Sequence, residues 1–294
     1  MGSVNLSWDS DGAFETFSIY RSDEVIDINN LPVPLVMGLT SKTYQDNSIV
    51  VGTTYHYIVA AVQGANSKLS EEVVVLADAP PGDAYFANVV SLNHFNGTDG
   101  SSASQDVKSG ISWALSSTKL SNIQTKFGAT SLKGNKSRAD VTLHSAIGTD
   151  DFTIEFWVYP TAASTEYFFS SPYIAGSWFA IGFDGSAKKF ITFLAGGGKR
   201  MGTETFDLNT WHHVAIVKTA GYSKFYVNGR NIAYSTAPDT KNYTHTLLHI
   251  AGTSTSISES GSWFSGFIDD FRYTKGVARY TENFTPPLLE FSDY

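Results

Sequence analysis

One ten-residue segment, DFTIEFWVYP at positions 151–160, constrains the fold of this chain more than any other. Apolar residues occupy every second position: one face carries Phe152, Ile154, Phe156 and Val158, and the other carries Thr153, Glu155, Trp157 and Tyr159. A period of two predicts a β-strand, because successive side chains of a strand point to opposite faces. Short segments of β type recur along the chain, and no helical period rises above noise. The sequence therefore predicts an all-β protein.

Length and punctuation divide the chain into two predicted β domains. A length of 294 residues suggests about two domains, and the abundance of Gly, Ser, Thr and aromatic residues favours β-structure. Residues 1–77 contain candidate strands separated by turns, and the Pro-Pro-Gly run within 78–84 predicts a linker. The strands that follow, including an Asn-Gly hairpin in SKFYVNGRNIAY, predict one jelly-roll sandwich over residues 85–294.

Charge and cysteine content exclude several classes of function. The chain has no cysteine, which rules out disulfides and a cysteine-ligated zinc. A net charge of −8 argues against nucleic acid as a partner, because phosphate binding needs a basic face. No segment approaches the roughly 20 apolar residues that cross a bilayer, so we expect no membrane insertion, and no signal peptide is visible. Neutral glycans, proteins and cations remain as candidate partners.

The first domain resembles a fibronectin type III domain. The segment VVGTTYHYIVAAV is similar to the end of such domains, and the resemblance implies that Tyr55 hydrogen-bonds back to the preceding chain. It also implies that Trp8 is the core tryptophan of the second strand. A complete domain of this family has a further strand before the one that contains Trp8. We therefore expect either a fragment of a longer protein or an open sheet edge that can accept a strand from a partner.

The second domain resembles the concanavalin A-like, laminin G-type jelly roll. The matching segments are, in chain order, FGATSLKG, DFTIEFWVYP, WHHVAIVK, FYVNGR and GFIDDFRYTKGVARYTENFTPP. The segments VVSLNHFNGTDGS and TKGVARYTENFTPP resemble the version of this domain that is common in bacteriophage virion proteins. The resemblance implies adhesion, mostly to glycans, by a protein of the particle surface or tail. It does not fix the ligand, because function lies in loops grafted on the fold.

The adjacent carboxylates Asp269 and Asp270 raise the question of a metal site. Strict alternation places Asp269 on the face of Phe267, Phe271 and Tyr273, which we predict to be the core face. An inward carboxylate needs either backbone N–H donors or a hard cation. The resemblance implies that an Asp at this position often ligates a structural calcium beside the first strand of the domain. The oxygen donors of such a site would come from Asp269, Asn96, Gly97 and Asp99, and both alternatives stay open.

Aromatic residues in predicted loops are the candidates for ligand binding. Aromatic faces stack on sugar rings, and polar groups beside them bind the hydroxyls. The candidates are Tyr173, Trp178, Tyr243 and Trp263, and the competing interpretation for each is packing. In the closing segment we predict a clasp in which Val277, Tyr280 and Phe284 pack the C-terminal tail onto the sandwich.

The sequence offers little support for catalysis. Asp151 and Glu155 share a strand face, but four residues along a strand span about 13 Å. The two carboxyls of glycosidases are about 5 to 9.5 Å apart. No Gly-x-Ser-x-Gly motif is present. We expect a non-enzymatic virion protein, present in multiple copies, that adheres to host-surface glycan. The alternatives are a structural connector or decoration protein that binds other virion proteins, and an enzyme that degrades polysaccharide.

Overall fold

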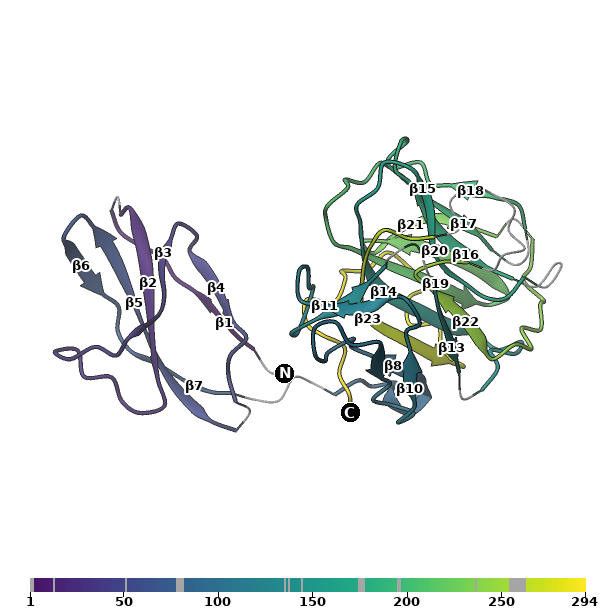
Figure 1. Cartoon of the computed structure of the whole chain (residues 1–294). Coiled ribbons are helices and arrows are strands. Elements are labelled where there is room, and N and C mark those ends of the chain that lie inside the picture. Colours follow the sequence, from purple (N-terminus) through teal and green to yellow (C-terminus); the bar gives the residue numbers. More distant parts are fainter. Residues whose placement is uncertain are drawn as a thin grey trace. The chain divides into compact units, whose positions relative to one another are not determined.

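The chain folds into two compact units, Met1–Gly82 (the N-terminal unit) and Asp83–Tyr294 (the C-terminal unit). The computed structural model describes residues 3–12, 14–50, 52–77, 82–134, 136, 138–143, 145–173, 178–194, 197–235, 237–253 and 263–294 (Figure 1). Most of the predicted linker, residues 78–81, lies outside this description. Asp83, which we assigned to the linker, belongs to the C-terminal unit. No helix within the described ranges is long and apolar enough to span a membrane.

The N-terminal unit is a sandwich of two small antiparallel sheets. One sheet pairs β1 (Val4–Ser7) with β4 (Thr43–Asp46). The other has the order β3, β2, β5, β6, and β7 pairs with the same strand β5 farther along. Its strands are β2 (Thr16–Ser22), β3 (Pro34–Leu39), β5 (Thr54–Gln63), β6 (Asn66–Leu69) and β7 (Val73–Leu76).

The core of the N-terminal unit lies between these sheets, where Val4, Ile19 and Tyr57 are buried. Trp8 directly follows β1 and packs against this core.

A turn before β5 is fixed by a tyrosine. The Val50 N–H donates to the Tyr55 hydroxyl at 3.0 Å, five residues back along the chain. The prediction that Tyr55 hydrogen-bonds back to the preceding chain is therefore confirmed.

The C-terminal unit is a larger sandwich of two antiparallel sheets (Figure 1). Among the described residues, the eight-stranded sheet has the order β11, β12, β23, β14, β19, β20, β21, with β8 also pairing with β23. Its strands are β8 (Val89–Asn93), β11 (Lys119–Ser121), β12 (Ser131–Lys133), β14 (Phe152–Pro160), β19 (His212–Thr219), β20 (Tyr222–Val227), β21 (Arg230–Tyr234) and β23 (Gly266–Lys275).

The second sheet of this unit has six strands within the described ranges, in the order β13, β22, β15, β16, β17, β18. Its strands are β13 (Ala139–Thr142), β15 (Thr165–Ser170), β16 (Ala180–Asp184), β17 (Lys189–Phe193), β18 (Arg200–Met201) and β22 (Leu247–Ile250). A 3-10 turn, η1 (Phe86–Asn88), precedes β8, and a small separate pair joins β9 (Ala103–Gln105) to β10 (Ser112–Ala114).

A phenylalanine-rich core fills the space between the two large sheets. Phe152 and Phe156 of β14 pack on Phe179, Phe169 and Phe271 with ring centroids 5.3 to 6.2 Å apart. The predicted alternation of β14 is confirmed, because Phe152, Ile154, Phe156 and Val158 all belong to this core. Each fully buried Phe contributes about 1.5–3 kcal/mol. Packing between the sheets therefore accounts for much of the stability of the unit.

The C-terminal tail covers part of the face of the eight-stranded sheet that points away from this core, which we call the outer face. Tyr280 stacks on Phe284 with centroids 3.5 Å apart, and both pack on Ala215, Val217 and Tyr226. The Phe284 N–H donates to Gly229 O at 2.9 Å, in the Asn-Gly hairpin turn between β20 and β21. The predicted clasp is confirmed for Tyr280 and Phe284, whereas Ala278 packs beside them in place of the predicted Val277.

A β-bulge in β23 reverses the predicted faces of its first half. Phe271 lies in the core as predicted, but Phe267 packs against Tyr159 on the outer face, and Ile268 takes its place in the core. Asp270 has a φ of 50°, and the register of β23 against β14 shifts at this point. A bulge inserts one extra residue and so shifts the alternation of faces by one position.

The prediction that Asp269 faces the core is wrong for this reason. Asp269 pairs with Trp157 of β14 and shares its outer face.

Candidate functional site

Four aromatic rings form a line on the outer face of the six-stranded sheet, which we call the aromatic ladder. Its members are Tyr173, Trp178, Phe193 and Tyr167. Successive ring centroids are 5.4, 4.6 and 6.1 Å apart. Tyr173 follows β15 and Trp178 precedes β16, so the hairpin between these strands brings two of the predicted ligand-binding residues together.

The strands β15 and β17 supply the base of the ladder. Phe193 and Ile191 alternate with the core residue Phe190 on β17, which directs Phe193 outward. Tyr167 lies over Gly182 of β16: a Cβ at Gly182 would be 2.7 Å from the Tyr167 ring. Each aromatic pair of this geometry contributes about 0.5–1.5 kcal/mol beyond its buried area. The ladder is therefore a stiff platform.

Only the outer end of the ladder is well exposed. Tyr173 is 45% exposed, whereas Trp178 is 7% exposed because Phe193 lies against its ring. Of the predicted pair, Tyr173 can offer a ring to a ligand and Trp178 supports it. Sequence reasoning missed Phe193 and Tyr167 because it searched loops alone. The outward positions of "KKFITF" and "TEYFF" were the available signal.

Two further predicted residues lie elsewhere. Tyr243 is completely buried, packs edge-on against Phe152 in the core, and donates its hydroxyl to Asp239. Burial raises its pKa well above the usual tyrosine range. The prediction that Tyr243 binds a ligand is wrong, because no face of its ring is accessible. Trp263 is 39% exposed beside Gly252 and has no aromatic contact among the described residues. Residues 254–262, which precede it, lie outside the described ranges.

The residues predicted to hold calcium instead receive hydrogen bonds, most of them from one loop. Asp269 Oδ2 accepts the N–H groups of Lys126 and Phe127 at 2.8 and 3.2 Å, and Oδ1 accepts the N–H of Asp270. Burial raises the pKa of Asp269, and these three N–H bonds oppose that rise. The side chain thus faces donors, whereas a calcium site needs further oxygen acceptors.

The other predicted calcium ligands bind the same loop, residues 122–130. Asp99 accepts the Asn122 N–H at 3.0 Å, and Asn96 accepts the Ala129 N–H at 2.9 Å. Gly97 donates its N–H to the Thr130 hydroxyl. Gly128 is required here, because a Cβ at its position would overlap the Asn96 amide. Each predicted ligand thus has a partner of its own on this loop.

One further observation bears on a metal. Within the described part of the chain, no group of three or more His, Asp or Glu is placed to hold one. The residues present do not fit a calcium ion. They fit the other alternative, in which Asp269 is satisfied by backbone donors.

Asp270 has a separate role from Asp269. Its Oδ1 lies 2.7 Å from His94 Nδ1, and its Oδ2 accepts the Phe291 N–H at 2.8 Å. Burial lowers the pKa of His94, but the bond to Asp270 and the nearby Glu290 outweigh it, so the pKa is raised. The Phe291 bond attaches the tail to β23, and the His94 contact joins β23 to the residue that follows β8.

Glu155 is the centre of a buried ionic network that sequence reasoning did not find. Arg272 donates from Nε and Nη2 to Glu155 Oε1 at 3.0 and 2.8 Å. Tyr280 donates its hydroxyl to Oε2 at 2.7 Å, and His213 Nε2 lies 3.2 Å from the same oxygen. Asp83 bridges Arg272 and Arg279.

This network holds Glu155 ionised. Although burial alone would raise the pKa of the Glu155 carboxyl, the charge of Arg272 and the bond to His213 hold it far below the usual range. Glu155 is fully buried under the tail. It therefore has neither the access nor the protonation state of a catalytic acid.

Comparison with known proteins places the C-terminal unit in a class defined by its fold, the concanavalin A-like β-sandwiches. Residues 133–278 match a family model described as the concanavalin A-like lectin/glucanases superfamily. This match covers just under half of the chain. No curated protein shows significant sequence similarity to the chain.

Several solved structures show a weak similarity to this chain. A Trypanosoma rangeli sialidase in complex with sialic acid is 12% identical, with a TM-score of 0.49 over 75% of this chain and 40% of the sialidase. The binding domain of botulinum neurotoxin serotype D/C is 14% identical, with a TM-score of 0.47 over 71% of this chain and 51% of that one. A pentraxin from Limulus polyphemus is 15% identical, with a TM-score of 0.38 over 49% of this chain and 73% of the pentraxin. These similarities are weak, and no property of these proteins is carried over to this chain.

Proposed function

We propose that the C-terminal unit is a non-enzymatic adhesion module that binds a glycan through the outer end of the aromatic ladder. The observation that carries this proposal is the arrangement of Tyr173: a half-exposed ring backed by Trp178 and Phe193. An exposed aromatic face that is held by neighbouring rings is suited to stacking on a sugar ring. The match to a superfamily of lectins and glucanases supports the same class of ligand.

The proposal that the protein is not an enzyme is supported by the state of its carboxylates. Glu155 and Asp269 are fully buried, and each is saturated by its own partners. Neither can reach a glycosidic bond. A sensitive assay for reducing ends released from bacterial polysaccharides tests this point, and sustained release would overturn it.

We further propose that the chain is part of a bacteriophage particle, on its surface or tail. The resemblance of TKGVARYTENFTPP to phage virion modules supports this proposal. The Tyr55 bond in the N-terminal unit supports a fibronectin type III-like module beside it. Repeated copies on a particle would make weak single sites sufficient through avidity.

The decisive experiment is binding to a glycan array with and without Tyr173→Ala. We expect the variant to bind about fivefold more weakly, since one aromatic contact contributes about 1 kcal/mol. Tyr222→Ala is the matched control, because Tyr222 is 44% exposed on β20 and outside the ladder. Absence of all glycan binding by the unaltered chain, with calcium present, would contradict the adhesion proposal.

A structural role is the second candidate, and the edge of β1 favours it. Within the described residues β1 pairs with β4 alone, so its other edge can accept a further strand. If the protein connects virion proteins, hydrogen exchange at Asn5 and Ser7 will slow in the assembled particle relative to the free chain. Unchanged exchange at both positions would count against strand addition.

A further inference from the structure

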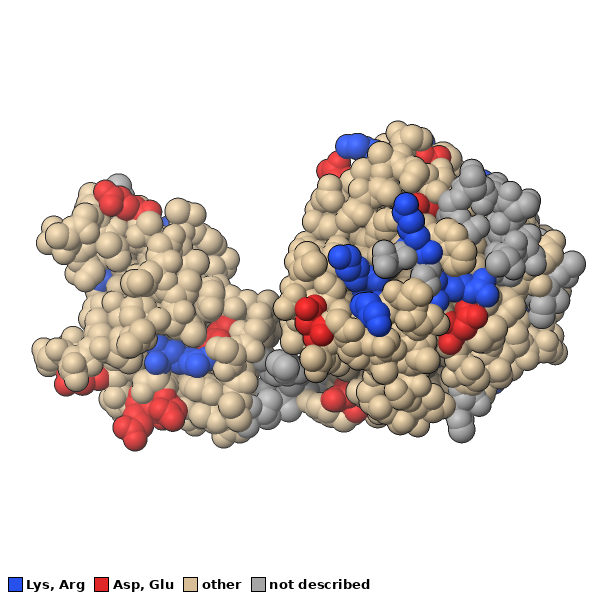
Figure 2. Space-filling view, viewed as in Figure 1, with Lys and Arg blue, Asp and Glu red and all other residues tan. Residues whose placement is uncertain are grey.

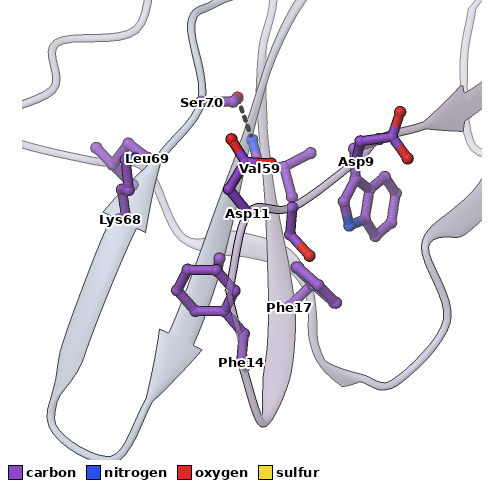
Figure 3. A pocket seen from close by; sticks show the side chains of 11 residues that line it. Asp9, Asp11, Phe14, Phe17, Val59, Lys68, Leu69 and Ser70 are labelled. Atoms are coloured by element: carbon purple, nitrogen blue, oxygen red, sulfur yellow. Dashed lines mark hydrogen bonds between the residues drawn. The ribbon is translucent and has the colours of Figure 1, made fainter.

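A pocket of about 190 Å³ opens in the N-terminal unit, at one end of its sandwich. The loop after β1 forms one wall with Trp8, Asp9 and Asp11. The strands β2, β5 and β6 contribute Phe17, Val59, Ala61, Lys68 and Leu69, and Phe14 precedes β2. Figure 3 shows Lys68 and Leu69 across from Asp9, with Phe14 and Phe17 beside the space between them.

The aromatic wall of the pocket is held in place by the fold. Phe17 is buried on β2, in register with Ala61 of β5. Trp8 packs edge-on against Phe17 at 5.5 Å, and Phe14 lies 6.5 Å from the same ring. Trp8 and Phe14 are only partly buried, so part of each remains available to a ligand.

The polar groups of the pocket include both donors and acceptors. The indole Nε1 of Trp8, one of the lining residues, is a buried donor with no hydrogen-bond partner among the residues that the structure describes. A buried N–H without an acceptor is unfavourable, and most such groups in proteins are satisfied. The side chains of Asp9 and Asp11 are exposed acceptors, and Lys68 is an exposed donor. A ligand that pairs with all of these groups must both accept and donate hydrogen bonds.

Size and charge narrow the ligand further. A cavity of about 150 Å³ is known to hold benzene, so this pocket holds one six-membered ring and little more. The N-terminal unit has ten acidic and three basic residues, a formal charge of −7, which disfavours anionic ligands. Figure 2 shows acidic side chains exposed on this unit.

We propose that this pocket binds one uncharged pyranose ring. The hydroxyls of a sugar donate and accept, so that they can satisfy Trp8 Nε1, the two Asp side chains and Lys68 together. Its apolar ring face can pack on the wall formed by Trp8 and Phe14. The pocket shares no residue with the aromatic ladder. The proposal for the pocket can therefore be tested independently of the proposal for the ladder.

The test is a titration of the ¹⁵N-labelled full chain with the methyl glycosides of glucose, galactose and N-acetylglucosamine, with glucuronic acid as the charged comparison. We expect at least one neutral glycoside to shift the Trp8 indole N–H resonance saturably, and glucuronic acid to bind more weakly. Trp8→Phe keeps the aromatic wall but removes the donor, and we expect its affinity, read from the backbone amide resonances of Val59 and Leu69 in the pocket lining, to fall about fivefold. Lys68→Ala, an exposed change that leaves the core intact, serves as a second variant with a loss of about threefold.

Two control variants separate this site from other effects. Trp211→Phe removes another buried indole N–H, in the C-terminal unit, that has no partner within the described part of the chain, and Tyr173→Ala removes the exposed ring of the ladder. Both should leave the titration unchanged. The proposal is overturned if no neutral glycoside shifts the Trp8 indole resonance, if glucuronic acid binds as tightly as the neutral sugars, or if Trp8→Phe and Lys68→Ala bind like the unaltered chain. Loss of binding in Tyr173→Ala alone would assign the sugar to the ladder instead.

Discussion

Glu155 and Asp269 are two fully buried carboxylates on the outer face of the same sheet, on the neighbouring strands β14 and β23. Glu155 accepts two hydrogen bonds from Arg272 and one from the Tyr280 hydroxyl, and His213 Nε2 lies 3.2 Å from it. Asp269 has backbone N–H donors from a loop instead. The pKa of Glu155 is accordingly lowered by Arg272 in spite of burial, whereas burial raises that of Asp269. The comparison shows that backbone N–H groups can fill the hydrogen-bonding positions of a buried carboxylate. They offset less of the free-energy cost of burying its charge than an arginine does.

The largest effect is expected from Glu155→Ala. Removal of this carboxylate leaves Arg272 and His213 buried without their main acceptor, which typically costs about 3–5 kcal/mol. The free energy of unfolding of the C-terminal unit, from urea denaturation of the full chain, measures this loss. Glu282→Ala, an exposed change in the tail, is the control and should cost less than about 0.5 kcal/mol. A loss below about 1 kcal/mol in Glu155→Ala would show that the network is not a stabilising centre.

A smaller effect is expected from Asp269→Asn. The amide keeps one acceptor oxygen but turns an NH₂ group toward the donors of the 122–130 loop, which leaves a buried N–H unsatisfied at a cost of about 1–3 kcal/mol. Amide exchange at Lys126 and Phe127 should become faster, because their acceptor is weakened. Asp293→Asn near the exposed end of the tail is the control. Unchanged exchange at both amides would contradict the assigned role of Asp269.

Sequence patterns predicted the features that depend on the local spacing of residues. They failed for features that depend on how distant strands pair. The alternation of β14, the Asn-Gly hairpin and the clasp at Tyr280 and Phe284 follow from local spacing. The bulge at Asp270 does not, because only pairing against β14 reveals the extra residue.

The candidate site was predicted in part for the same reason. Tyr173 and Trp178 flank one hairpin and so were found together, whereas Phe193 joins them from another strand. The sequence places Tyr243 in a predicted loop, but an isolated β-bridge to Gly148 holds it where its ring packs in the core. The partners of Glu155 come from positions 58 to 125 residues away, which no motif connects.

The two carboxylates should also respond to pH with opposite slopes. The pKa of Glu155 is lower in the folded state, so its stabilisation is present above the unfolded pKa near 4.5 and is lost as pH falls below it. The pKa of Asp269 is higher in the folded state, so its contribution is full below the unfolded pKa near 3.8 and is lost as pH rises through the folded value. The cost of Glu155→Gln should therefore be larger at pH 7 than at pH 4, and that of Asp269→Asn larger at pH 4. The loss of free energy of unfolding in each variant can be measured by urea denaturation at both pH values. If this loss changes with pH in the same direction in both variants, the two carboxylates do not differ as proposed.

The smallest expected effect is that of calcium on stability. It tests whether Asp269 is satisfied by backbone donors alone. Because its oxygens already accept three backbone N–H groups, the carboxylate has little capacity left for a cation. We expect the melting temperature of the C-terminal unit to be the same in a chelator and in excess calcium. A bound ion at a hundred times its Kd would add about 2.7 kcal/mol to the free energy of unfolding. A calcium-dependent rise in melting temperature that disappears in Asp269→Asn, but persists in Asp293→Asn, would restore the metal alternative and require the 122–130 loop to move away from Asp269.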